Sequence, residues 1–197
     1  VSPIKLYQEL VRMHREEGVS FRNVVTFNLD EYLPMPKESE QSYHYFMHHH
    51  LFDHIDIDPK NIHIPDGTLE GDEIDKFCRD YEKAIEAAGG IDLQILGIGR
   101  TGHIGFNEPG SFITSQTRKV FLNDLTIKDA IKDFGSRNLV PTKAITMGVG
   151  TIMQARRVIL MAWGEKKAPI IKATVEGRVS DSVPATFLQM HSNVQFI

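Results

Sequence analysis

Short apolar runs alternate along the chain with amphipathic helical segments, and this alternation constrains the fold more than any other feature of the sequence. Near-continuous apolar, β-rich runs are typical of buried parallel strands. The two clearest runs are residues 24–29 and 91–96, and later strands are predicted at 144–147, 157–162 and 193–197. Strands that alternate with helices favour an α/β fold with an open, mostly parallel sheet and helices on both faces.

Helices are predicted between these strands from apolar spacing and terminal residues. The first begins at Ser2-Pro3, which reads as a helix cap followed by proline at the first helical position, and it stops at Gly18. Further helices are expected at 42–54, 72–88 and 165–177. The sequence contains no internal repeat, low-complexity tract or linker, so residues 1–197 are predicted to form a single domain.

Composition excludes several classes of protein. The chain has 22 basic and 26 acidic residues, a net charge of −4, which argues against nucleic-acid binding. Its longest wholly apolar run, residues 158–163, falls far short of the roughly 20 residues of a membrane helix. The single cysteine, Cys78, excludes an intramolecular disulfide framework and fits a reducing compartment, and the N-terminal residues carry no export signal. We therefore expect a cytoplasmic protein without a membrane partner.

Polar side chains follow both of the clearest strands, where α/β proteins bind their ligands. The first strand runs into Asp30, and the second runs into a loop that carries His103 and Glu108. Histidine titrates near pH 6.5, a neighbouring carboxylate can fix its tautomer, and a second carboxylate can abstract a carbon-bound proton. The alternative is that Asp30 caps the next turn and Glu108 caps a short helix. Spacing alone favours neither interpretation.

Gly97, Gly99 and Gly102 match the Gly-x-Gly-x-x-Gly pattern of dinucleotide-binding proteins, but their context argues against such a site. Residues 108–110 (Glu-Pro-Gly) interrupt any following helix, and some twenty residues further on lies only a mixed-charge stretch, 118–124. We interpret these glycines as allowing the backbone to approach a small ligand closely.

Histidines crowd the predicted helix at 42–54, two pairs of them at i, i+4 spacing, but no carboxylate completes an HExxH pattern. We therefore predict no metal site. Four cations are candidates for binding an anion, with a solvated surface as the alternative for each of them. They are Arg118, Lys132, Lys166 and Lys167.

Two stretches, residues 24–32 and 102–109, resemble the signatures of glucosamine-6-phosphate deaminases. They read Val-Val-Thr-Phe-Asn-Leu-Asp-Glu-Tyr and Gly-His-Ile-Gly-Phe-Asn-Glu-Pro. The related 6-phosphogluconolactonases share the glycine pattern before the histidine but do not continue as His-Ile-x-Phe-Asn-Glu-Pro. Further matches spread the resemblance over nearly the whole chain. They are Ser42-Tyr43 with Phe46-Met47, residues 146–151, and Leu188-Gln189-x-His191.

The resemblance implies a Rossmann-like α/β fold and the conversion of glucosamine 6-phosphate to fructose 6-phosphate and ammonia, without a cofactor or metal. It makes Asp30 the base that moves the C2 proton to C1, His103 the catalyst of ring opening, and Glu108 the partner that orients the imidazole. The expected partner is a small sugar phosphate, in a homo-oligomer. Family position further implies substrate contacts and one effector or phosphate contact. The substrate contacts are Ser2, Glu31, Thr101, Gly102, Lys132 and Lys167, and the effector or phosphate contact is Arg118.

The chain departs from the family pattern in several places. Thr101 stands where the family has aspartate, and a hydroxyl cannot balance the charge of an imidazolium. Lys132 stands where arginine is usual. The family's N-terminal strand, its phosphate loop and its C-terminal end are expected to be missing. Thr101 keeps two alternatives open: a hydrolase or isomerase of another sugar phosphate, similar to 6-phosphogluconolactonase, and a sugar-phosphate-sensing module without turnover.

Overall fold

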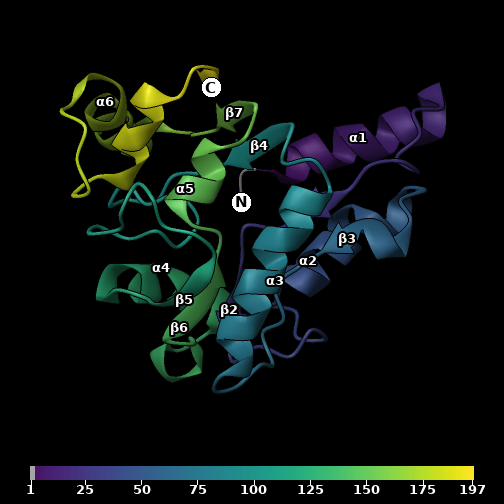
Figure 1. Ribbon diagram of the computed structural model, residues 1–197, viewed down its shortest axis with the longest axis horizontal. Helices are drawn as coiled ribbons and strands as arrows, with labels where there is room; N and C mark the ends of the chain where they lie inside the picture. The colour runs from purple at the N-terminus through teal and green to yellow at the C-terminus, as the bar shows by residue number, and fades with distance from the viewer. Residues whose placement is uncertain (1–2) are drawn as a thin grey trace.

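Three small β-sheets form the centre of the computed structural model, which describes residues 3–197. Helices lie on both sides of the strands: in Figure 1, α1, α2 and α3 are on one side, and α4, α5 and α6 are on the other. The α-helices are α1 (Ile4–Glu17), α2 (Tyr43–His50), α3 (Glu73–Ala87), α4 (Asp124–Phe134), α5 (Val149–Met153) and α6 (Ala168–Glu176). Short 3₁₀ helices span Phe52–His54, Pro59–Asn61, Arg137–Leu139, Glu165–Lys167 and Pro184–Met190.

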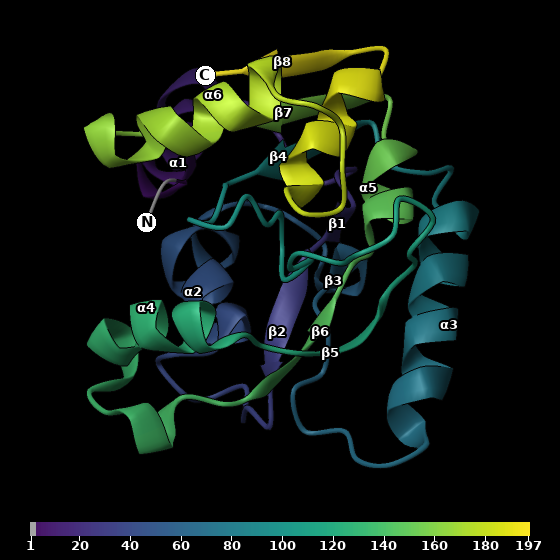
Figure 2. The ribbon, with the colours of Figure 1, turned by 90° about the vertical axis from the view of Figure 1, so that its left-hand side faces the viewer.

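The sheets are mixed and largely parallel, as the sequence predicts. Strands β1 and β3 pair in parallel, and so do β4, β7 and β8 in that order, whereas β2, β6 and β5 form an antiparallel sheet. Figure 2 views these sheets from the side of α4 and α6. The strands are β1 (Thr26–Phe27), β2 (Asp30–Leu33), β3 (Ile62–His63), β4 (Leu93–Leu96), β5 (Arg118–Phe121), β6 (Lys143–Thr146), β7 (Arg157–Leu160) and β8 (Val194–Phe196).

The antiparallel sheet corrects the prediction for the first strand. The predicted strand at 24–29 shortens to two residues in β1, and the residues that follow it, Asp30–Leu33, form a separate strand, β2, that was not predicted. The mixed-charge stretch at 118–124, where no strand or helix was predicted, contains β5 and the start of α4. Short strands rich in charged residues have weak intrinsic β propensity, so their pairing with β6 decides their conformation.

Apolar packing fixes β4 and β7 beneath the loop that leaves β4. Leu96, Val158 and Leu160 from these strands are almost completely buried, together with Ile104 of that loop and Ile152 of α5. A second cluster packs Tyr32 of β2 against residues of the loop and α4. The strand ends and the loop are therefore held as one packed unit. None of the helices in the described residues is long and apolar enough to cross a membrane.

Candidate active site

The loop after β4 folds back so that the His103 imidazole lies directly on the backbone of Gly99. The Gly99 N–H donates to the His103 carbonyl at 2.9 Å, and a Cβ at residue 99 would overlap the His103 ring at Nε2. Gly102 has a φ of +78°, and a Cβ there would overlap Val183 Cγ1. Both glycines are thus required by close contacts, in the way expected for a loop that brings backbone near a small ligand.

His103 is paired with Glu108 inside this loop. The two side chains are 17% and 12% exposed, and His103 Nδ1 lies 3.1 Å from Glu108 Oε2. The Thr101 hydroxyl lies 2.9 Å from the same Nδ1 and 3.3 Å from Glu108 Oε2. An ionised carboxylate only accepts hydrogen bonds, so the Nδ1 atom carries the proton and Nε2 remains available for proton exchange with a ligand.

Glu108 is held ionised by donors on both of its oxygens. Burial raises the pKa of its carboxyl, but the hydrogen bonds and charge of His103, together with the Thr126 and Thr101 hydroxyls, outweigh burial and bring the pKa below its ordinary value. The Asn123 amide also donates to Glu108 Oε2, at 2.8 Å. Asn123 and Thr126 belong to the start of α4 and were not predicted from the sequence.

Asp30 is the first residue of β2 and reaches the same loop from a different sheet. Its partner in β6 is Thr146, and a Cβ at Gly105 would lie 2.9 Å from Thr146 Oγ1 and 3.3 Å from Asp30 Oδ2. Within the described residues no donor forms a hydrogen bond or ion pair with the Asp30 carboxylate. Burial, with a contribution from the charge of Glu31, raises the pKa of Asp30 to about 8. The fold therefore brings an unpaired carboxylate against the loop of His103 and Glu108.

Glu31 has a different environment from its neighbour Asp30. Its side chain is buried, and its oxygens accept the backbone N–H groups of Tyr32, Tyr43 and His44 at 3.0, 3.1 and 3.0 Å. Burial raises the pKa of Glu31 to about 7, against the lowering effect of these hydrogen bonds. The carboxylate fixes the N-terminus of α2, where it also complements the helix dipole. A substrate contact by Glu31 stays a prediction.

Cations lie beside the same loop. Lys167, in the turn before α6, donates from Nζ to the Ile98 carbonyl at 2.5 Å. Burial lowers its pKa, and the nearby charges of Arg100 and Lys132 act in the same direction. Lys132 stands in the last turn of α4. Substrate binding by Lys132, Lys167, Thr101 and Gly102 stays a prediction, and Ser2 lies outside the described residues.

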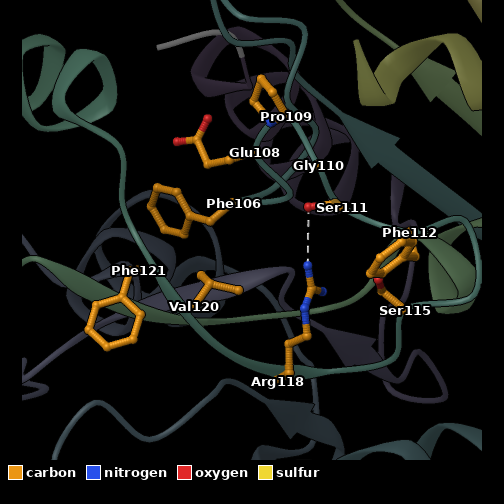
Figure 3. Close-up of a pocket in the computed structure, with 10 residues that line it drawn as sticks. All are labelled: Phe106, Glu108, Pro109, Gly110, Ser111, Phe112, Ser115, Arg118, Val120 and Phe121. Carbon is orange, nitrogen blue, oxygen red and sulfur yellow. Dashed lines mark hydrogen bonds between the residues drawn. The ribbon is translucent and has the colours of Figure 1, made fainter. Parts of the chain in front are cut away.

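Arg118 lines a cavity of about 250 Å³ that Glu108 also lines. Its guanidinium donates to Asn107 Oδ1 at 2.9 Å and to Ser111 Oγ at 3.2 Å. Figure 3 shows the arginine reaching up to Ser111, with Phe112 and Phe121 at the two sides of the cavity. Burial lowers the pKa of Arg118. Its role as an effector or phosphate contact stays a prediction.

The histidines of α2 pair with one another and with neighbouring groups. His44 and His48 stack with ring centroids 4.5 Å apart, and His48 Nδ1 lies 2.8 Å from Asp53 Oδ1. In the part of the chain that the structure describes, His, Cys, Asp and Glu side chains form no group of three suited to a metal ion.

The fold and this arrangement define an α/β protein with a proton-transfer site at the ends of its strands. Comparison with known proteins gives a narrower assignment: the chain belongs to the glucosamine-6-phosphate deaminase family. The family model described as glucosamine-6-phosphate isomerases/6-phosphogluconolactonase matches residues 1–196.

Individual relatives agree with this assignment. A glucosamine-6-phosphate deaminase from Thermoanaerobacter sp. (strain X514) is 48% identical over 196 residues, which are 100% of this chain and 77% of that protein. A putative glucosamine-6-phosphate deaminase-like protein from Bacteroides thetaiotaomicron is 50% identical over 192 residues, and the match spans 98% of this chain but only 29% of that longer protein. A solved monomeric glucosamine-6-phosphate deaminase superimposes with a TM-score of 0.96 at 40% identity, over 100% of this chain and 80% of its own.

Proposed function

We propose that this chain converts glucosamine 6-phosphate to fructose 6-phosphate and ammonia by aldose–ketose isomerisation with deamination. The observation that carries the proposal is the unpaired Asp30 carboxylate, placed against Gly105 in the loop that holds the His103–Glu108 pair. The names of the relatives at 48–50% identity support the choice of substrate.

His103 opens the sugar ring in this proposal. With its Nδ1 proton directed to Glu108, the neutral imidazole takes the proton of the C1 hydroxyl at Nε2 and returns a proton to the ring oxygen. Glu108 stabilises the imidazolium that forms between these two transfers. Thr101 fixes the position of the imidazole ring through its hydroxyl. Because this hydroxyl is neutral, Glu108 supplies the charge that balances the imidazolium.

Asp30 carries out the isomerisation. Its carboxylate takes the proton from C2 of the open-chain aldehyde, the electron pair of that C–H bond forms the C1–C2 double bond, and the C1 oxygen takes a proton from solvent to complete the enol. Return of the proton to C1 produces an imine at C2, which water hydrolyses to the ketone with release of ammonia. A pKa of about 8 leaves only a minor fraction of Asp30 ionised at pH 7, so ammonium release should rise as the pH approaches 8.

Anionic substrate binding is assigned to the cations beside the loop. Lys167 and Lys132 approach the site from α6 and α4, and their mutual repulsion falls when a phosphate lies between them. Gly102 would allow the sugar to lie against backbone. The proposal also includes a homo-oligomer, a cytoplasmic location and a single domain over residues 1–197. Sedimentation velocity with and without substrate tests the oligomeric state.

The decisive experiment measures ammonium release from glucosamine 6-phosphate by the wild-type chain, Asp30→Asn, and the control Asp92→Asn, whose carboxylate is exposed. We expect release by the wild type and the control and a loss of at least about 1,000-fold in Asp30→Asn. Release that survives Asp30→Asn would remove the base assignment. Acid release from 6-phosphogluconolactone in place of ammonium would indicate a lactonase, and calorimetric binding without turnover would indicate a sensing module.

A further inference from the structure

The Glu108 carboxylate is fixed from outside its own loop, by the first turn of α4. The Thr126 hydroxyl donates to Glu108 Oε1, and Asn123 Nδ2 donates to Glu108 Oε2 at 2.8 Å. Glu108 Oε2 is the same oxygen that lies 3.1 Å from His103 Nδ1. The two α4 residues thus act on both oxygens of the carboxylate that faces the imidazole.

The orientation of the Asn123 amide follows from its second hydrogen bond. Its Oδ1 accepts the backbone N–H of Thr126 at 2.9 Å, which makes Asn123 the N-cap of α4. With the oxygen committed to the helix, only the NH₂ group can face Glu108. The start of α4 and the His103–Glu108 pair are therefore parts of one hydrogen-bond network.

Neutral donors matter here because Glu108 is half-buried and its imidazole partner carries no positive charge in the Nδ1–H tautomer. Among the described residues, the one titratable side chain paired with Glu108 is His103: Arg100 is paired with Asp129, Asp124 is paired with Arg137, and Arg118, which lines the same cavity as Glu108, donates to Asn107 and Ser111. Burial favours the protonated carboxyl, and hydrogen bonds to the ionised form oppose that effect. A protonated Glu108 would donate a hydrogen bond and would no longer hold the proton on His103 Nδ1.

We propose that Asn123 and Thr126 are positioning residues that keep Glu108 ionised and aligned, and so hold His103 in the Nδ1–H tautomer needed for ring opening. The inference rests on the function proposed above. It also gives α4 a second role beside carrying Lys132, because the N-terminal end of this helix is locked to the proton-transfer pair.

Two disruptive substitutions, Thr126→Val and Asn123→Asp, and two controls separate this role from a structural one. Thr126→Val keeps the shape of the side chain and removes the hydroxyl, whereas Thr126→Ser keeps a hydroxyl. Asn123→Asp keeps an oxygen for the helix cap and replaces the amide donor with a second carboxylate facing Glu108. Thr174→Val is the matched control, because the Thr174 hydroxyl is buried and has no hydrogen-bond partner among the residues that the structure describes.

The first readout is the tautomer of His103, measured on the substrate-free chain by ¹⁵N NMR of the imidazole. We expect the Nδ1–H share to fall in Thr126→Val and Asn123→Asp and to stay at the wild-type value in Thr126→Ser and Thr174→Val. The second is the midpoint of the Glu108 titration, followed by ¹³C NMR of its carboxyl, which should move up by about one pH unit in the first two variants. In both, kcat should fall at least about tenfold with KM within about twofold.

Wild-type tautomer content and an unshifted Glu108 titration midpoint in both Thr126→Val and Asn123→Asp would overturn the positioning role. An equal loss in Thr126→Ser and Thr126→Val would overturn it as well, because the serine retains the donor. If the wild type releases no ammonium, the proposed function fails, and the NMR readout still decides whether α4 sets the state of His103.

Discussion

Asp30 should reduce the stability of the fold at the pH at which it serves as a base. The folded state raises the pKa of this carboxyl from an ordinary value near 3.8 to about 8. The folded protein therefore binds the Asp30 proton more tightly than the unfolded chain does. Between these two pKa values the folded state holds a proton that the unfolded state has released. Stability then falls as the pH rises from about 4 to about 8.

The size of the effect follows from the shift. A difference of one unit in pKa corresponds to about 1.4 kcal/mol. If the carboxyl were fully shielded from water, the folded protein would therefore lose about 6 kcal/mol of stability by pH 8. Asp30 retains partial solvent exposure, and we discount the loss to about 2–4 kcal/mol for the resulting screening. An asparagine amide carries no charge at any pH. Asp30→Asn should therefore be more stable than the wild type by about 2–4 kcal/mol at pH 8, and by less than about 1 kcal/mol at pH 4.

Urea unfolding at pH 4, 6 and 8 tests this expectation on the wild type, Asp30→Asn and the exposed control Asp92→Asn. The difference in free energy of unfolding from the wild type should grow with rising pH for Asp30→Asn and stay constant for Asp92→Asn. At pH 8 its melting temperature should lie about 5–15 °C above that of the wild type. Equal or lower stability of Asp30→Asn at pH 8 would refute the reasoning, because the ionised carboxylate would then be stabilised in the folded protein.

Three other predictions concern the surroundings of the site. Gly99→Ala should lower kcat at least about 100-fold with an unchanged circular dichroism spectrum, because the added Cβ displaces the His103 imidazole; full kcat would contradict the close contact. Glu31→Ala should lower the free energy of unfolding at pH 5, below the raised pKa of the carboxyl, by about 1–3 kcal/mol in urea titrations, because three backbone donors lose their acceptor; unchanged stability would argue against the role in fixing α2. Lys167→Met should raise KM for the sugar phosphate at least about tenfold with kcat within about threefold, and an unchanged KM in steady-state kinetics would remove Lys167 from substrate binding.

The sequence predicts those parts of the site that lie in one continuous segment. His103 and Glu108 are five residues apart in a loop after an apolar strand, and their distance of 3.1 Å is set within that loop. The existence of parallel strands is also predicted by apolar runs separated by helical segments, and the structure adds that β4 pairs with β7. Both features depend on local pattern, which sequence reasoning reads well.

The contribution of α4 could not be predicted in the same way. Asn123 and Thr126 are 15 and 18 residues from Glu108, and their contact requires β5 to pair with β6 first. Strand β5 is four residues long and begins Arg118-Lys119, so neither apolar alternation nor β propensity marks it. The one available signal is Asn123 itself, a preferred N-cap residue at the start of a helix.

Strand β2 explains how two adjacent carboxylates come to have opposite roles. Successive side chains of a strand point to opposite faces, so Asp30 and Glu31 cannot share an environment. One face directs Glu31 to the N-terminus of α2, where three backbone donors occupy its oxygens. The other directs Asp30 to the loop at Gly105, where no donor in the described residues binds it. A general base has to remain free of competing donors, and a capping carboxylate has to be saturated with them. A shift of one residue in the register of β2 would turn each carboxylate to the opposite face, so neither would keep its present surroundings.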